Sequence, residues 1–158
     1  MLVDKFTEID LHPKAVSNHE MGYIFEELLR RFSEMSNETA GEHYTPREVI
    51  HLMVNLLFAE HKKELKGKGI IRTVYDPACG TGGMLTIAKE HIKNNINSDV
   101  EVVLYGQESN EQTYAIAKSD VLIMGEDADN IKLGSTFSRH GFSGRKFNFM
   151  LSNPPFGV

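Results

Sequence analysis

The sequence lacks the features that mark secreted and membrane proteins. Its single cysteine, Cys79, excludes an internal disulfide framework and indicates a reducing compartment. No run of about 18 apolar residues is present, so no membrane-spanning helix is expected. The N-terminal stretch MLVDKFTEIDLHPK carries three acidic residues and no apolar core, which is unlike a signal peptide. We therefore expect a cytoplasmic protein with no membrane contact.

The sequence also has little positive charge. Its 158 residues include 17 Lys and Arg against 22 Asp and Glu, which gives a formal net charge of −5. Such a chain is a poor electrostatic match for nucleic acid on its own, so a DNA-related function requires further segments or a partner. What remains is the composition of one globular domain, 41% hydrophobic and 25% charged, with no low-complexity tract and no internal repeat.

The first third of the chain is expected to be helical after an extended arm at residues 1–18. The stretch MGYIFEELLRRFSEM, residues 21–35, has apolar side chains at helical spacing. A second helix begins in YTPREVIHLMVNLLFAEHKKEL, with Thr45 as N-cap, Pro46 at the first helical position and Glu48 as the capping-box partner. The stretch KGKG ends it. We expect its buried stripe to consist of Val49, Leu52, Met53, Leu56 and Leu57.

After KGKG, apolar runs alternate with helical patterns. The expected strands are IIRTVYD, VEVVLYGQE, NIKLGST and FNFMLSN. Between them lie the helices MLTIAKEHIKNNI and SNEQTYAIAKSDVLIMG, the second with Ser109 as N-cap, Gln112 as its partner and Gly125 at its end. The alternation predicts an α/β fold: a partial doubly wound, mostly parallel Rossmann-like sheet of about four strands, preceded by N-terminal helices. We expect residues 1–66 to lead into the sheet domain and residues 67–158 to form it.

The turn DPACGTGGM follows the first expected strand and is the first chemical signal. Gly80, Gly82 and Gly83 let the backbone turn sharply and let a ligand approach it closely. They are spaced neither as G-x-G-x-x-G nor as a P-loop, so a triphosphate is not the expected ligand. Asp76 at the strand end is well placed for a ligand amine. A tight strand-to-helix turn without a ligand is the structural alternative.

Two further stretches extend this signal. Glu108 ends the second expected strand, where an acidic residue in such folds accepts hydrogen bonds from the two ribose hydroxyls; a solvated surface glutamate is the alternative. The stretch EHYTPRE, residues 42–48, is a capped helix start whose free N–H groups suit a carboxylate. A metal ligand at His43 is not expected, because no second His or Cys lies at a ligand spacing.

The C-terminal SNPPF, residues 152–156, is the most specific of the motifs. Pro154 and Pro155 end the strand and hold the chain rigid. The side-chain oxygen of Asn153 and the carbonyl of Pro154 can accept hydrogen bonds from an exocyclic aromatic amine as its nitrogen attacks an electrophile. Phe156 can stack on the flat ring. A plain strand terminator is the alternative.

Taken together and in this order, the motifs resemble those of the methyltransferase subunit of type I restriction–modification systems, a DNA adenine-N6 methyltransferase that uses S-adenosylmethionine. The resemblance covers residues 21–158. MGYIFEELL…GEHYTPREV resembles the segment that leads into the catalytic domain, DPACGTGGM the methionine-binding turn and NPPF the amine-binding motif. It implies a direct displacement in which adenine N6 attacks the methyl group, without a covalent intermediate or a metal. It also implies a target base flipped out of the duplex.

The resemblance also implies site residues. The cofactor site would be lined by Glu42, His43, Tyr44, Thr45, Pro46, Arg47, Asp76, Thr81, Gly82 and Gly83, with Glu108 on the ribose. The flipped adenine would be held by Asn153, Pro154, Pro155 and Phe156. Two positions depart from the family pattern, because Ser135 and Asn148 stand where the family usually has Asp.

The resemblance further implies that the chain is truncated. Sheets of this family have more strands than the four expected here, and the family's long N-terminal helical domain is nearly absent. We therefore expect this chain alone to be inactive in methyl transfer. We also expect its fourth strand to offer an open edge for self-association.

Other interpretations stay open. The same Asn-Pro-Pro chemistry serves cytosine N4, RNA or a protein glutamine amide, although Phe156 and the YTPRE helix favour adenine. A fragment that binds cofactor or partner subunits without catalysis is the alternative from another class. The expected partners are DNA, a DNA-specificity subunit and a restriction or translocase subunit. The basic residues Arg139, His140, Arg145 and Lys146 can contact a phosphate backbone or form a solvated loop.

Overall fold

The computed structural model describes most of the chain beyond its first 44 residues. The described residues are 45–155, together with the short pieces 8–10, 12, 14–16, 21, 24, 27 and 28. Contacts divide the chain into two units, Met1–Ala40 and Gly41–Val158. In the first unit the helical residues are Met21, Ile24, Glu27 and Leu28; the rest of the helix expected at residues 21–35 lies outside the described residues. No helix in the described ranges is long and apolar enough to cross a membrane.

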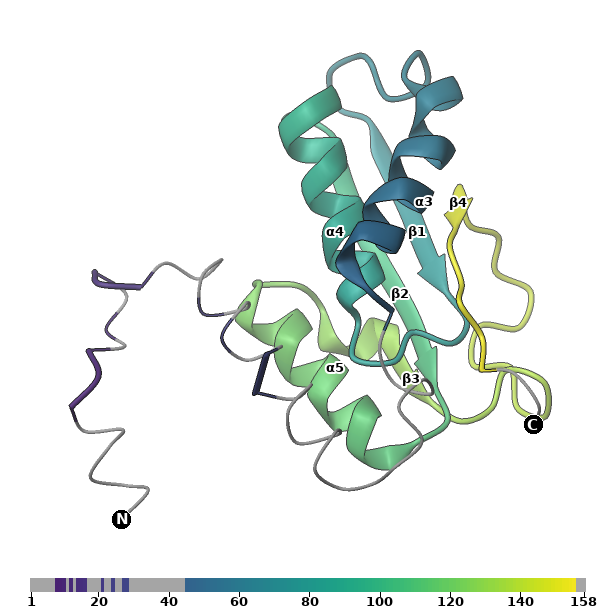
Figure 1. The fold of residues 1–158 in the computed structure, drawn as a ribbon. Coiled ribbons are helices and arrows are strands. Elements are labelled where there is room, and N and C mark those ends of the chain that lie inside the picture. Colours follow the sequence, from purple (N-terminus) through teal and green to yellow (C-terminus); the bar gives the residue numbers. More distant parts are fainter. Residues whose placement is uncertain are drawn as a thin grey trace. The chain divides into compact units, whose positions relative to one another are not determined.

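Four parallel strands form one sheet in the second unit, in the order β3-β2-β1-β4 (Figure 1). Their bounds are Ile71–Asp76 for β1, Glu101–Glu108 for β2, Ile131–Leu133 for β3 and Phe149–Met150 for β4. Each lies within the stretch predicted from the sequence, because buried parallel strands are short continuous apolar runs. β4 is shorter than the expected strand FNFMLSN, of which it covers only Phe149 and Met150.

The strand order reverses beside β1. β1 pairs with β2 along its full length, from Ile71↔Glu101 to Asp76↔Gly106, and the chain continues outward to β3. It then returns and places β4 on the other side of β1, with Tyr75 in register with Met150. In open α/β sheets, ligands bind outside the carboxyl ends of the strands at such a reversal. The carboxyl ends of β1 and β4 are therefore where a ligand site is expected.

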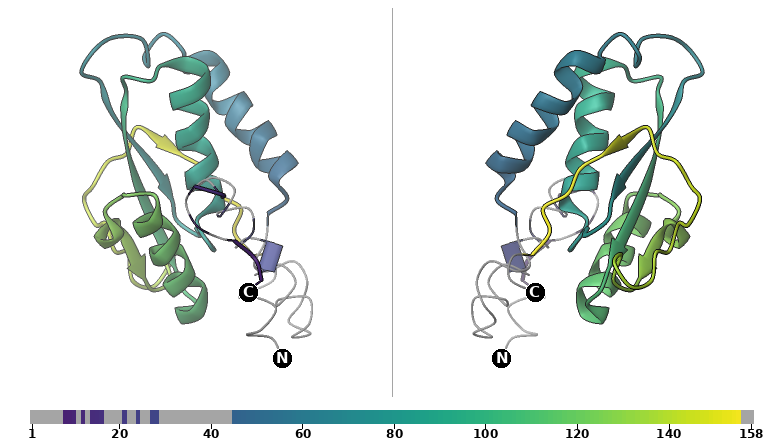
Figure 2. Two further views of the ribbon diagram at one scale, coloured as in Figure 1. Left: turned by 90° about the vertical axis from the view of Figure 1, so that its left-hand side faces the viewer. Right: turned by 90° about the vertical axis from the view of Figure 1, so that its right-hand side faces the viewer.

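Three helices cover one face of the sheet. α3 (Arg47–His61) and α4 (Gly83–His91) lie side by side, as both views in Figure 2 show, and a π-helical turn at Ile92–Ile96 extends α4. α5 (Glu111–Ile123) contacts β2 and β3. These helices share one buried core with alternate residues of the strands. Its members include Val54, Phe58, Val74, Leu85, Ala88, Val102, Leu104, Ala117 and Val121.

The opposite face of the sheet is covered by aromatic side chains. Tyr75 of β1 and Tyr105 of β2 pack there against Phe142 and Phe147, both from the β3–β4 loop, residues 134–148. Phe147 stacks on Tyr75 with ring centroids 4.4 Å apart, and Phe142 meets Tyr105 edge-on at 5.4 Å. The described residues thus supply a helical layer for one face of the doubly wound sheet and an aromatic cover for the other.

The buried stripe of α3 differs from the one predicted. The buried apolar residues of this helix are Ile50, Val54 and Phe58. Of the predicted stripe, Met53 and Leu57 pack against the core only in part, whereas Val49, Leu52 and Leu56 are exposed. The helix has apolar residues on more than one face, so two overlapping stripes fit its sequence. In the stripe that is buried, the Phe58 ring packs edge-on against the ring of Phe149 in β4, with ring centroids 5.0 Å apart.

α3 also begins and ends differently from the prediction. Its N-cap is Pro46, with no side-chain capping hydrogen bond, so the hydroxyl of Thr45 is not a cap and is available for another contact. The last residue of the helix is His61, and turns rather than helix lead from there to KGKG. α3 packs against α4 and shares its core, so it belongs to the same unit as the sheet.

The N-cap of α5 is one residue later than predicted, whereas its end is confirmed. Asn110, not Ser109, caps the helix, because its side-chain oxygen accepts hydrogen bonds from the N–H groups of Gln112 and Thr113. Asn and Ser are about equally good N-caps, so residue type cannot choose between neighbours. Gly125 follows the last turn with a φ of +75°, the left-handed conformation that ends many helices.

Candidate functional site

The turn after β1 is folded tightly against the end of β2. The N–H of Cys79 donates to the carbonyl of Gln107 at 2.9 Å, and the N–H of Gly82 donates to the carbonyl of Cys79 at 2.8 Å. Gly80 and Gly82 have φ values of +55° and +91°, which favour glycine. Gly106 makes the close approach possible, since a Cβ there would lie 2.9 Å from Cys79 Sγ. The turn is therefore held in one place at the carboxyl edge of the sheet.

Glu108 at the end of β2 reaches the same turn. Its Oε2 accepts a hydrogen bond from the N–H of Gly80 at 2.9 Å, and its Oε1 accepts one from the N–H of Asn110 at 2.8 Å. Two carboxylate oxygens have about four acceptor positions, so both retain capacity for hydroxyl donors of a ligand. The glycine turn and the acidic strand end, two separate signals in the sequence, lie in direct contact.

Asp76 is the buried acid of this group. Its side chain is 2% exposed, and Oδ1 accepts a hydrogen bond from the N–H of Ala78 at 3.0 Å. Burial raises the pKa of Asp76 to about 7; the Ala78 hydrogen bond opposes the rise, the negative charge of Glu108 adds to it, and a hydrogen bond with Ser152 opposes it. Two carboxylates beside one turn, one of them buried, favour a positively charged ligand over a phosphate.

The segment after β4 lies beside this turn. The N–H of Leu151 donates to the carbonyl of Tyr75 at 3.0 Å, which continues the β1–β4 pairing up to the residue before Asp76. The contact of Ser152 with the Asp76 carboxyl follows from that register. The next three residues are exposed: Asn153, Pro154 and Pro155. The tip of the last strand and the glycine turn thus form one surface.

Thr45 joins the start of α3 to this surface. The side-chain nitrogen of Asn153 donates to Thr45 Oγ1 at 3.0 Å, although the two residues are 108 positions apart in the sequence. The contact explains what the Thr45 hydroxyl does instead of capping α3. The contact also orients the Asn153 amide. Its nitrogen is bound to Thr45, so its oxygen faces away from Thr45 and can accept a hydrogen bond from another group.

The remaining predicted site residues are placed as follows. Arg47 begins α3; burial raises the pKa of Asp120 in α5, and the charge of Arg47 opposes that rise in small part. Thr81 is half-buried in the glycine turn, and Gly83 is the first residue of α4. Glu42, His43, Tyr44 and Phe156 lie outside the described residues. In the described ranges no group of three His, Cys, Asp or Glu side chains could hold a metal ion.

Two residues that the sequence analysis did not single out attach the β3–β4 loop to the site. Gln107 is fully buried; its Nε2 donates to the carbonyls of Gly134 and Arg139, and its Oε1 accepts from the N–H of Gly141. The hydroxyl of Thr136 donates to the carbonyl of Pro77 at 2.5 Å. Gln107 could have been recognised in the sequence, because it is a polar residue near the end of an otherwise apolar strand.

The two departures from the family pattern have different surroundings. Asn148 Oδ1 accepts hydrogen bonds from the N–H and the hydroxyl of Thr73, so Asn148 fastens the start of β4 to β1. Ser135 lies in the β3–β4 loop next to Thr136, and its carbonyl accepts from the N–H of Arg139 at 2.8 Å. Asn148 is therefore a structural contact, whereas Ser135 lies beside the turn after β1.

Comparison with known proteins gives a consistent result. The sequence profile of the N-6 DNA Methylase family matches residues 16–158. The MjaIX methylase subunit of a type I restriction enzyme from Methanocaldococcus jannaschii is 31% identical over 98% of this chain, and the EcoEI methylase subunit from Escherichia coli is 29% identical over 99%. This chain spans only 26% and 31% of the length of these two relatives.

Solved structures support the same fold. The crystal structure of a type I restriction–modification methyltransferase subunit from Streptococcus thermophilus matches 93% of this chain and 29% of its own, with a TM-score of 0.66 and 28% identity. A protein from Listeria monocytogenes described as a class I S-adenosylmethionine-dependent methyltransferase matches with a TM-score of 0.69 at 20% identity, covering 94% of this chain and 42% of its own. At that identity the second match bears on the fold alone.

Proposed function

Since the chain belongs to the N-6 DNA methylase family, we propose that it forms the cofactor- and base-binding part of an adenine-N6 DNA methyltransferase, the modification subunit of a type I restriction system. One observation carries the proposal. The turn after β1 and the tip of β4 lie side by side, joined by the Leu151–Tyr75 hydrogen bond and by the contact of Ser152 with Asp76. A methyl donor on the turn and an amino group at the tip would meet there.

The charge of the turn fits S-adenosylmethionine. This cofactor supplies a sulfonium-activated methyl group and carries an amino group and two ribose hydroxyls. In this proposal Asp76 accepts from the cofactor's amino group, Glu108 accepts from the ribose hydroxyls, and Thr81, Gly82 and Gly83 let the methionine part approach the backbone. The burial that raises the pKa of Asp76 to about 7 disfavours its anion, and a bound cation compensates for that.

The tip of β4 fits a planar amine. The nitrogen of an exocyclic amine is a weak nucleophile, because its lone pair is delocalised into the ring. Asn153 Oδ1 and the Pro154 carbonyl would accept its two N–H groups and stabilise the positive charge that develops on nitrogen as the methyl group is transferred. Two consecutive prolines keep these acceptors from moving away. A duplex base reaches them only after it is flipped out.

The partners are part of the proposal. The formal charge of −5 argues that a DNA-specificity subunit brings the recognition sequence to this chain. A restriction or translocase subunit would complete such a system. In this proposal the protein acts on DNA in the cytoplasm.

Transfer of a labelled methyl group from S-adenosylmethionine tests the proposal. A full-length modification subunit that contains these residues, in complex with a DNA-specificity subunit, is offered DNA, RNA and protein. We expect label at adenine N6 of DNA and a loss of at least about a hundredfold in Asn153→Ala, because an acceptor of transition-state charge is removed. Asn94→Ala, at an exposed position after α4, is the control and should retain activity. Cofactor binding with no transfer to any substrate would instead favour a non-catalytic binding role.

A further inference from the structure

The charge of the chain is distributed very unevenly along its sequence. All 22 acidic residues precede Ile131, and the stretch from Ile131 to the end contains four Lys and Arg and no Asp or Glu. Three of these cations, Arg139, Arg145 and Lys146, are exposed in the β3–β4 loop. Among the described residues no carboxylate forms an ion pair with any of them. An acidic chain thus carries one local segment that attracts anions.

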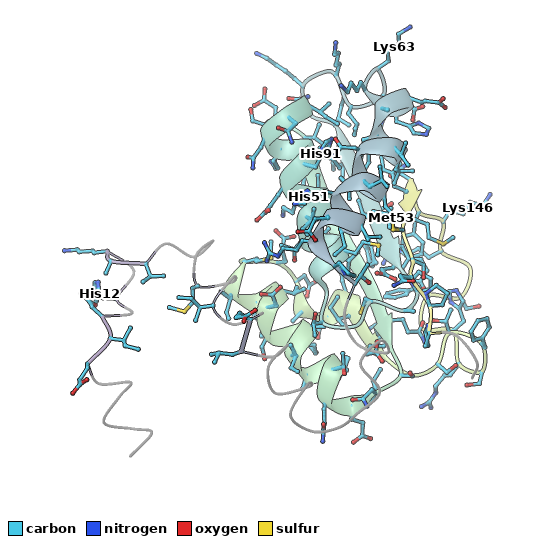
Figure 3. The ribbon with its side chains drawn as sticks, in the orientation of Figure 1. His12, His51, Met53, Lys63, His91 and Lys146 are labelled. Carbon is cyan, nitrogen blue, oxygen red and sulfur yellow. The ribbon has the colours of Figure 1, made fainter. Side chains whose placement is uncertain are left out.

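The loop that carries these cations is attached firmly to the sheet. Gln107 binds its backbone at three points, and Phe142 is buried against Tyr105. The guanidinium carbon of Arg145 lies 4.3 Å from the centre of the Tyr105 ring, a cation–π contact. Figure 3 shows Lys146 extending outward from the same loop beside β4. The loop therefore presents its charges at fixed positions.

Phe137 is the unusual residue of this loop. Its side chain is 97% exposed, whereas Phe142 and Phe147 of the same loop pack into the aromatic cover of the sheet. It directly follows Thr136, whose hydroxyl holds the carbonyl of Pro77 in the turn after β1. Arg139 lies two residues further on, with its side chain against Gly134. An aromatic ring in water and a guanidinium group therefore stand at the rim of the candidate site.

We propose that Phe137 and Arg139 contact the DNA strand beside the flipped adenine: the Phe137 ring stacks on a base left unpaired or unstacked, and Arg139 binds a phosphate. This inference rests on the proposed function, because it assigns the surface that holds the substrate near the amine-binding tip. Aromatic rings next to cations bind single-stranded nucleic acid in this way, since every base has a face for stacking and every nucleotide a phosphate. Arg145 and Lys146 extend the path for the backbone away from the site.

Salt dependence separates the two contacts. The chain in complex with a DNA-specificity subunit is titrated into a fluorescein-labelled DNA duplex with one mismatched adenine, and anisotropy is recorded at several salt concentrations. We expect Arg139→Ala to weaken binding and to reduce the slope of log K against log salt by about 0.9, the value for one phosphate contact. We expect Phe137→Ala to weaken binding at least about fivefold at every salt concentration with no change of slope, because stacking releases no counterions.

The control is Lys63→Ala, which removes one exposed charge beyond the far end of α3, where Figure 3 shows Lys63 extending outward. It should leave affinity and slope nearly unchanged. Equal effects of Arg139→Ala and Lys63→Ala, a slope change in Phe137→Ala, or no binding of the duplex by the wild-type complex would overturn the inference. A separate titration with S-adenosylmethionine keeps the proposals apart: cofactor binding with unaltered DNA slopes refutes this inference alone, whereas absence of cofactor binding refutes the proposed function.

Discussion

Burial of the Asp76 carboxyl in the candidate site is unfavourable for the stability of the fold. The carboxyl is 2% exposed and accepts a hydrogen bond from the N–H of Ala78, and in the described part of the chain no ion pair joins it to a cation. Burying a carboxylate without a paired cation is unfavourable, and the protein responds by raising the pKa of Asp76 to about 7. A cation bound beside it would remove that penalty, which is why we place the cofactor's amino group there.

The raised pKa of Asp76 makes stability depend on pH. The folded state holds a proton on Asp76 up to its raised pKa of about 7, whereas the unfolded state loses it near the ordinary aspartate pKa of 3.8. The folded state therefore binds more protons between these two values. The contribution of Asp76 to the free energy of unfolding should fall as pH rises through this window, by at most about 1.4 kcal/mol per unit, and level off above it.

Asp76→Asn should remove this dependence while keeping an acceptor for the N–H of Ala78. Denaturant unfolding of both proteins at a series of pH values measures the difference. Wild type should lose stability relative to Asp76→Asn as pH rises from about 4 to 7. Parallel curves for the two proteins would show that Asp76 titrates normally.

Thr45 is expected to act on the proposed reaction through Asn153. Thr45→Val keeps the shape of the side chain but removes the oxygen that accepts from the Asn153 amide at 3.0 Å. The amide then loses its fixed orientation, so kcat should fall by up to about tenfold, the worth of one hydrogen bond, with little change in KM for the cofactor. Thr45→Ser retains the hydroxyl and should retain kcat.

Two readouts check this expectation in a full-length modification subunit bound to its specificity subunit. Methyl-transfer kinetics give kcat and KM, and NMR of the Asn153 side-chain amide reports whether its hydrogen bond survives. Equal kinetics of Thr45→Val and Thr45→Ser would mean that the contact does not orient Asn153.

Among the elements, the end of β2 and the turn after β1 depend on one glycine. A Cβ on Gly106 would lie 2.9 Å from Cys79 Sγ and 3.0 Å from Ile131 Cδ1, both in the buried core. Gly106→Ala should therefore lower the free energy of unfolding by about 1–3 kcal/mol. Gly83→Ala is the matched control, because Gly83 lies in α4 with no atom within 4 Å of an added Cβ.

Thermal or denaturant unfolding of these two variants distinguishes them. Gly83→Ala should be neutral or raise stability by up to about 1 kcal/mol, since alanine is the better helix former. A Gly106→Ala protein as stable as wild type would show that the turn is able to move away from β2.

The elements also show what sequence patterns can and cannot predict. The strands were predictable because each is a short apolar run, and the end of α5 because only Gly125 takes its left-handed φ cheaply. The buried face of α3 was not, since its apolar residues surround much of the helix and the choice depends on contact with Phe149 of β4, far away in the sequence. The N-cap of α5 was not predicted because Ser109 and Asn110 are about equally good caps, and that of α3 was not because the Thr45 hydroxyl binds Asn153 instead.

For the whole second unit, the strand order explains why separate motifs meet. The reversal beside β1 brings the strand that ends at Asp76 next to the strand that leads to Asn153. The direct methyl transfer that the resemblance implies requires this juxtaposition. The Thr45–Asn153 contact and the attachment of the β3–β4 loop by Gln107 were not predictable, because they depend on side-chain directions in the assembled fold.

The most direct test of the account is an NMR titration of the 158-residue chain with S-adenosylmethionine, followed at the backbone amide of Gly80 and the side-chain amide of Asn153. If the turn after β1 and the tip of β4 form one site, both resonances should shift with the same Kd. The amides of Gly67 and Gly69, in the connection between α3 and β1, should stay in place. A shift at Gly80 with none at Asn153, or no binding, would contradict the claim that methyl donor and amine meet at this edge of the sheet.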